Sequence, residues 1–198
     1  MKKLTLTILF GLLVVPYVMA QGYDIGDEAM NFRLKNVDGS YVSLSDYQDE
    51  KGVIVIFTCN HCPYAQAWED RIIQLDKQYD KKGYPVVAIQ PNDPALSPGD
   101  SFENMKKRAR NKNYPFPYLL DETQEVYRTY GATKTPHAFV LENQAGNFVV
   151  RYIGTIDDNY KNPQAVEKKY LASALNSLLN GSEPNPAKTK AIGCSIKD

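Results

Sequence analysis

The sequence has few cysteines and no excess of charge of either sign. Its 198 residues include three cysteines, two histidines and one tryptophan, with 23 basic and 23 acidic side chains. This balance argues against nucleic acid as the partner, because phosphate binding needs clustered positive charge. The one basic run, within residues 106–112, lies in a helix-like stretch and is expected to be a solvated face.

Long hydrophobic runs are also missing after the first twenty residues. Lys2 and Lys3 precede an apolar run over residues 4–18, and small Ala20 stands before Gln21, which is typical of a cleavable signal peptide over residues 1–20. The apolar run is shorter than the roughly 20 residues that a spanning helix needs. The sequence therefore predicts a periplasmic or secreted protein with no stable membrane insertion.

Three cysteines are too few for a scaffold stapled by disulfides, and their odd number leaves at least one unpaired or transiently paired. The count therefore indicates redox chemistry. About 180 residues remain after cleavage, a length that normally forms one domain with a sizeable core. We expect this domain over residues 21–181, followed by a tail over residues 182–198 that contains Cys194.

A β-α-β unit is predicted near the middle of the chain. Residues 52–57 form a continuous β-branched and aromatic run, typical of a strand buried on both faces. Apolar residues then recur at spacings of three and four between residues 65 and 79, which predicts a helix. Residues 85–90 resemble a second buried strand, so the connection should be right-handed and the sheet parallel at this point.

Other segments predict the rest of the domain. Asp38-Gly39 indicates the turn of a hairpin that precedes the β-α-β unit. Asp100, with Glu103 three residues later, resembles the start of a helix that runs to Lys112. The remaining expected elements are a short strand at 115–120, a short helix at 122–130, an antiparallel hairpin of strands 137–142 and 147–153, and an amphipathic helix at 164–179.

The pair Cys59 and Cys62 lies where the first buried strand runs into its helix. Unpaired amide groups of the first helical turn stabilise a thiolate there, so Cys59 should be acidic and nucleophilic. Cys62, one turn deeper, would resolve the mixed disulfide. His61 between them is expected to lower the pKa of Cys59 further, and so to raise the reduction potential of the pair above that of thioredoxin.

Two structural interpretations compete with redox exchange at this pair. A zinc site would need a second pair of ligands, for which only His137 and Cys194 remain. A permanent Cys59–Cys62 disulfide would close so short a loop that it constrains the unfolded chain little. Thiol–disulfide exchange is therefore the favoured interpretation.

With these residues in view, the sequence resembles the thioredoxin superfamily, in particular its redoxin or AhpC/TSA-like branch. The resemblance covers about residues 26–179 and depends on residues 57–63 (FTCNHCP) and on Thr135-Pro136. It implies an α/β, thioredoxin-like fold, with a central mixed β-sheet flanked by helices and an N-terminal β-hairpin extension. It also implies that Cys59 attacks, that Cys62 resolves, and that Thr135 precedes a cis Pro136 whose backbone receives the substrate chain.

The sequence departs from the superfamily pattern in ways that bear on activity. Thr58 replaces the usual tryptophan, and Asn60-His61 replaces glycine–proline, which resembles the motifs of oxidising disulfide enzymes and puts thioredoxin-type reductase activity in doubt. Peroxiredoxins carry a threonine three residues before the peroxidatic cysteine, whereas Thr58 precedes Cys62 by four. A thiol peroxidase is therefore the weaker alternative.

Another alternative is a copper-binding metallochaperone. Copper-delivery proteins of this fold use two cysteines and a histidine, which here would be Cys59, Cys62 and His137, although their cysteines are one residue further apart. His137 could also be a proton shuttle near the disulfide, but a strand-start histidine satisfied by its neighbours is the simpler interpretation. Cys194 is a candidate third redox thiol or an idle tail thiol.

The prediction is thus an exported thiol–disulfide oxidoreductase. Its partners would be protein or small-molecule thiols and disulfides and a redox-recycling partner, which sets the direction of electron flow. No cofactor is expected, because the electrons pass through sulfur. The sequence predicts no particular oligomeric state.

Overall fold

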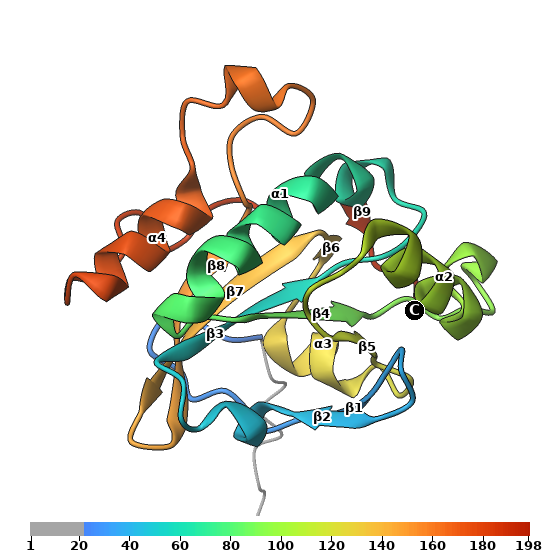
Figure 1. Cartoon of the computed structure of the whole chain (residues 1–198), viewed down its shortest axis with the longest axis horizontal. Coiled ribbons are helices and arrows are strands. Elements are labelled where there is room, and N and C mark those ends of the chain that lie inside the picture. The colour runs from blue at the N-terminus through green and yellow to red at the C-terminus, as the bar shows by residue number, and fades with distance from the viewer. Residues whose placement is uncertain (1–21) are drawn as a thin grey trace, which may run out of the picture.

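The computed structural model describes residues 22–198 (Figure 1). The expected signal peptide and the cleavage point before Gln21 lie outside the described residues. Within the described part, no helix combines the length and the apolar character needed to cross a membrane.

A seven-stranded mixed sheet forms the centre of the fold, in the order β2-β1-β5-β4-β3-β7-β8. The strands are β1 (Arg33–Asn36), β2 (Tyr41–Ser43), β3 (Gly52–Phe57), β4 (Val86–Gln90), β5 (Tyr118–Leu120), β6 (Lys134–Thr135), β7 (His137–Gln144), β8 (Asn147–Gly154) and β9 (Cys194–Ser195). The α-helices are α1 (Pro63–Tyr79), α2 (Phe102–Lys112), α3 (Glu125–Tyr130) and α4 (Tyr170–Leu179), and the 3₁₀ helices are η1 (Leu44–Tyr47), η2 (Asp80–Lys82), η3 (Pro98–Asp100) and η4 (Pro163–Ala165).

Pairing in the sheet confirms the predicted topology. β3 pairs in parallel with β4, so the β3-α1-β4 segment is the expected β-α-β unit. β7 pairs antiparallel with β3 and with β8, and the β1–β2 hairpin joins the other edge through β5. The thioredoxin-like fold with an N-terminal hairpin, expected from the resemblance, is therefore the fold of this chain.

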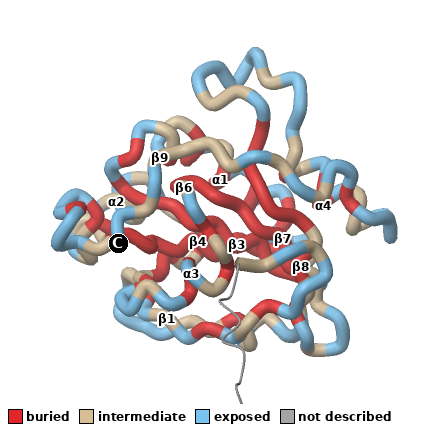
Figure 2. The backbone as a smooth tube through the Cα atoms, turned by 180° about the vertical axis from the view of Figure 1, so that it is seen from behind, coloured by how far each residue is buried: buried red, intermediate tan, exposed pale blue. Residues whose placement is uncertain are grey.

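Strand β3 is buried at every residue, because helices or loops cover both faces of the sheet. Ile54 and Ile56 point to one face, where they share a hydrophobic cluster with α1, α2 and α4. Val53 and Val55 point to the opposite face, which α3 and the N-terminal segments cover. Figure 2 shows the buried residues gathered along the central strands, with exposed segments around them. This two-sided burial explains why the strand is a continuous apolar run rather than an alternating one.

Three predicted helix starts were wrong, and the helix expected from residue 122 begins at Glu125. The helix expected from Asp100 begins at Phe102 after the N-cap Ser101, because the Asp100 side chain turns inward instead of capping. The helix expected from residue 164 begins at Tyr170. The carboxylate of Asp158 accepts hydrogen bonds from the backbone amides of Glu167 and Lys168, which ties this stretch outside the helix.

The basic run is also not simply a solvated face. Arg108 of α2 donates to both carboxylate oxygens of Glu69 in α1, at 2.6 and 2.7 Å, and Lys112 lies 3.1 Å from the same carboxylate. The Tyr114 hydroxyl donates to Glu69 as well. Burial favours the neutral form of Glu69, but these donors outweigh it and lower the pKa of the carboxyl. The cluster fixes α2 against α1.

Replacing Glu69 should therefore destabilise the fold. In Glu69→Ala the Arg108 guanidinium and the Tyr114 hydroxyl lose their partner, and we expect a loss of about 2–4 kcal/mol in the free energy of unfolding, measured by urea denaturation at pH 7. Folding lowers the pKa of the Glu69 carboxyl. The difference in unfolding free energy between the wild type and Glu69→Ala is therefore fully present above pH 4.5, the ordinary pKa of this group, and becomes smaller at lower pH.

The control for this experiment is Glu103→Ala, which removes an exposed ion pair with Lys106 on the same helix α2. It should leave the urea midpoint close to that of the wild type. Equal effects of the two substitutions would contradict the structural role given to Glu69.

Candidate active site

The CxxC motif joins β3 to α1. β3 ends at Phe57, and Cys62 is the N-cap residue of α1 with Pro63 in the first turn. A proline is tolerated there because the amide it lacks would have no partner within the helix. Cys59 is 6% exposed and Cys62 is fully buried, so both thiol positions lie beneath the surface.

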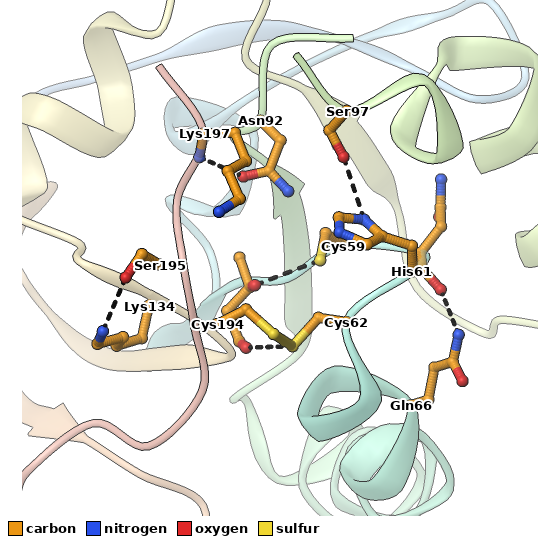
Figure 3. The surroundings of a disulfide bond; sticks show 12 residues. Cys59, His61, Cys62, Gln66, Asn92, Ser97, Lys134, Cys194, Ser195 and Lys197 are labelled. Atoms are coloured by element: carbon orange, nitrogen blue, oxygen red, sulfur yellow. Dashed lines mark hydrogen bonds between the residues drawn. A yellow bond between two sulfur atoms is a disulfide. The ribbon is translucent and has the colours of Figure 1, made fainter.

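The disulfide in the structure is not the expected one. Cys62 is bonded to Cys194, 132 residues away, with 6.1 Å between their Cα atoms, and Cys59 is a free buried thiol (Figure 3). The Cys59–Cys62 disulfide that exchange would form at the motif is therefore not the disulfide present in this structure. Cys194, which the sequence left as either a third redox thiol or an idle tail thiol, thus lies at the motif.

Thr135 brings these sulfurs to one place. Its side-chain Oγ1 lies 3.2 Å from the Cys59 Sγ, and its backbone oxygen lies 3.2 Å from the Cys62 Sγ. Its backbone also pairs with that of Cys194 through the β6–β9 ladder. The Thr135–Pro136 bond is cis, as the resemblance implied. Thr135 therefore contacts or pairs with all three cysteines.

The pKa of Cys59 is raised, which contradicts the expectation of an acidic thiol. Burial raises the pKa most, and the negative charge of Asp100 raises it further. Hydrogen bonds from Thr135 and from the backbone amides of Cys62 and His61 lower it, but by less. The stabilisation expected at the helix start is thus present, and desolvation and a like charge outweigh it.

His61 is bound to the buried carboxylate that raises the Cys59 pKa. The His61 Nδ1 lies 2.6 Å from the Asp100 Oδ2, and the His61 side chain is 43% exposed whereas that of Asp100 is fully buried. A hydrogen bond to Nδ1 fixes the tautomer of a neutral imidazole, so Nε2 is left as the acceptor. Asp100 therefore orients His61 beside the thiol.

Asp100 accepts hydrogen bonds from several further donors. Its Oδ1 receives the backbone amides of Asn60, at 2.7 Å, and of His61, at 3.3 Å. Its Oδ2 receives the Asn92 side-chain amide, at 2.7 Å, and the Ser97 hydroxyl, at 2.8 Å. These bonds compensate the cost of burying the charge and connect η3 to the CxxC loop.

Asp100 was predicted to be a helix cap and not a site residue, because an aspartate before a helical run is typical of a cap. The spacing to His61 gives no signal, since the contact depends on the path of the loop after β4. Only the tertiary structure places this carboxylate under the motif.

His137 has the contacts of a buried histidine that is held by its neighbours. It is the first residue of β7, it is buried, and its Nδ1 accepts a hydrogen bond from the Thr133 amide at 3.3 Å. Burial lowers the pKa of His137 to about 4, so the ring is neutral at pH 7. Its ring also packs against Phe139.

The three ligands of the copper alternative are not assembled in the described part of the chain. Cys62 is bonded to Cys194, and the cysteine, histidine and carboxylate groups there that converge within 4.8 Å are Cys59, His61 and Asp100. Both oxygens of Asp100 are already occupied by hydrogen bonds. A metal ion would have to displace these donors, so the cluster is better described as a hydrogen-bond network around a thiol.

Comparisons with known proteins place these residues in a family context. The AhpC/TSA family profile matches residues 25–159. The thiol-disulfide oxidoreductase ResA of Bacillus thuringiensis subsp. konkukian is 25% identical over 148 residues, which cover 71% of this chain and 80% of that protein. The chloroplastic peroxiredoxin Q of Triticum aestivum is 24% identical over 155 residues, covering 78% and 66%.

A solved structure resembles this chain over almost its whole length. It is an uncharacterized conserved protein from Geobacillus kaustophilus, 40% identical, with a TM-score of 0.81 and coverage of 94% of this chain and 98% of that one. The match extends beyond the segment covered by the family profile, so the similarity includes helix α4.

The influence of Asp100 on Cys59 can be tested in the disulfide-bonded form, in which Cys59 is the one free thiol. Asp100→Asn removes the negative charge, so the midpoint of the pH profile for iodoacetamide alkylation should move to lower pH. Ser97→Ala is the control, because it removes a hydrogen bond to Asp100 and keeps the charge. A profile that is unchanged in Asp100→Asn would contradict the electrostatic effect.

Proposed function

We propose, because the chain belongs to the AhpC/TSA family of the thioredoxin superfamily, that it is an exported thiol–disulfide oxidoreductase using the CNHC motif at the β3–α1 junction. The proposal rests on one observation: the buried residue Thr135 contacts both the free thiol of Cys59 and the sulfur of Cys62, which is in the disulfide with Cys194. The similarity to ResA supports the same class of reaction.

In the proposed reaction, Cys59 and Cys62 act in sequence. The thiolate of Cys59 attacks a partner disulfide and forms a mixed disulfide, and one partner sulfur leaves as a thiolate. The Cys62 thiolate then attacks the Cys59 sulfur, which releases the second partner sulfur and leaves a Cys59–Cys62 disulfide. The partner is reduced by two electrons and the enzyme is oxidised by two. The reverse sequence oxidises a partner dithiol.

The remaining site residues position or deprotonate these thiols. Because the pKa of Cys59 is raised, the attack needs a proton acceptor, and His61 oriented by Asp100 is suited to that role. Thr135 contacts both sulfurs, and a cis bond joins it to Pro136. His61 was expected to tune the potential; the contacts favour a role in positioning and proton transfer instead.

The alternatives have weaker support. Similarity to peroxiredoxin Q keeps a thiol peroxidase open. However, the hydroxyl that contacts Cys59 comes from Thr135 and not from a threonine three residues before the reacting cysteine. A copper metallochaperone would need Cys59, Cys62 and His137 to converge. The proposed partners are thiols or disulfides of exported proteins or small molecules and a recycling redox partner, with no organic cofactor.

Substitution of the two motif cysteines tests the proposal. With dithiothreitol as the reductant and a disulfide-linked peptide as the substrate, Cys59→Ser should lower the rate of disulfide reduction to the uncatalysed level. When dithiothreitol is removed before the peptide is added, Cys62→Ser should accumulate a mixed disulfide between Cys59 and the peptide, visible by intact-mass measurement. Retained activity in Cys59→Ser, or Cys59-dependent consumption of hydrogen peroxide at a higher rate than disulfide exchange, would overturn the proposal.

The reduction potential gives a second test. The pKa of the Cys59 thiol is raised, so the reduced form is not stabilised as a thiolate. The couple is therefore not expected to be more oxidising than that of thioredoxin. We expect the Cys59–Cys62 couple of a Cys194→Ser variant to have a potential near or below about −270 mV, the value for thioredoxin. Equilibration with a dithiothreitol redox series measures it. A much higher potential would restore the oxidising role.

A further inference from the structure

The tail brings a third cysteine to the motif as part of an extended strand. β9 pairs antiparallel with β6, with Cys194 opposite Thr135 and Ser195 opposite Lys134. In this register the Cys194 sulfur reaches Cys62, and Cys194 packs against the small cluster formed by Cys59, Cys62 and Ala65. The geometry is that of a mixed disulfide with a cysteine-bearing strand, supplied here by the chain itself.

Residues beyond the cysteine hold the strand in place. The Lys197 amide donates to the Asn92 side chain at 2.9 Å, and the Lys197 carbonyl accepts from the Asp93 amide at 2.8 Å and from the Gln124 side chain at 2.9 Å. Ile196 packs against the core cluster on the α3 face of the sheet. The strand is therefore held by backbone pairing, by the apolar side chain of Ile196, and by side-chain hydrogen bonds from Lys134 to Ser195 and from Tyr127 to Asp198.

The position before the cysteine accepts only glycine. A Cβ atom added at Gly193 would collide with the carbonyl group of Thr135. That carbonyl oxygen also faces the Cys62 sulfur. A side chain at residue 193 would therefore displace the strand from β6, and Cys194 with it.

We infer that residues 193–198 are a built-in competing strand. They close the site because they occupy the edge of β6, where a cysteine-bearing partner strand would pair. The site opens when Cys59 displaces Cys194 from the disulfide with Cys62. The inference rests on the proposed function in one respect, that Cys59 is the nucleophile. It adds a regulatory role for Cys194 and a preference for extended partner segments with glycine before the cysteine.

The opening step needs no external oxidant or reductant. The Cys59 thiolate attacks the Cys62 sulfur, so that a Cys59–Cys62 bond forms, the Cys62–Cys194 bond breaks, and Cys194 leaves as a thiolate. The proton lost by Cys59 is balanced by the proton that Cys194 takes up. The number of disulfides is unchanged, and the tail is then held only by its non-covalent contacts.

Disulfide mapping tests where the bond lies. The oxidised protein is alkylated, digested without reduction and analysed by mass spectrometry. The wild type should yield mainly the Cys62–Cys194 linkage, and Gly193→Val should shift it to Cys59–Cys62. Lys190→Ala, an exposed change in the same tail, is the matched control and should resemble the wild type. A wild-type map with only Cys59–Cys62 would overturn the inference and leave the proposed function intact.

Kinetics test whether the strand competes with a partner. A tethered strand acts at an effective concentration in the millimolar range, so Cys194→Ser should lower the KM for a peptide with a Gly-Cys segment by about ten-fold. It should leave the KM for the small disulfide of hydroxyethanethiol unchanged, because that substrate has no backbone to pair with β6. An unchanged KM would overturn the inference, whereas loss of all exchange in Cys59→Ser is required by the proposed function alone. The kinetic arm also remains decisive if Gly193→Val does not fold.

Discussion

The chemistry of this protein depends on the buried position of Thr135. Its hydroxyl, its carbonyl group and its place in the β6–β9 ladder bring Cys59, Cys62 and Cys194 to one edge. That position is fixed from outside the site, because β7 begins two residues later and pairs with β3, the strand that leads into the motif. The sheet therefore sets both halves of the site, the cysteines at the end of β3 and the receiving backbone before β7, and a change in the β3–β7 register would separate them.

The site also shows why a motif alone does not determine the acidity of a thiol. The features that lower a cysteine pKa are present at Cys59: backbone amides at a helix start and a hydrogen bond from Thr135. Burial and the Asp100 charge outweigh them, and the same carboxylate binds His61. Asp100 thus opposes thiolate formation electrostatically while it orients the group suited to accept the proton. This combination favours a thiol that reacts when a partner is bound rather than one that is permanently ionised.

The sequence predicted most of the fold because its signals there are local. The all-apolar β3 and the 3.6-residue period of α1 follow from burial on one or both faces, and the Asp38-Gly39 turn follows from backbone preference. The motif Cys59–Cys62 and the cis bond before Pro136 were also predicted, the latter from the resemblance alone. Asp100 and the pairing of Cys194 could not be predicted, because each depends on a long loop or tail returning to the motif. Nothing in the local sequence distinguishes such a segment from a solvated one.

The tail changes what the third cysteine means for the reaction. A free Cys194 on a loose tail would compete with Cys59 for any partner disulfide, but a seated Cys194 reaches only the buried Cys62. In the proposed reaction, this bond protects the resolving sulfur of Cys62, and the attacking sulfur of Cys59 stays reduced. Because Cys59 lies in the same cluster, it can convert this closed form into a Cys59–Cys62 disulfide without another reactant. The three cysteines thus give two oxidised states with the same number of electrons, one with a Cys62–Cys194 disulfide and one with a Cys59–Cys62 disulfide. The free energy with which the tail strand binds to β6 sets the equilibrium between them.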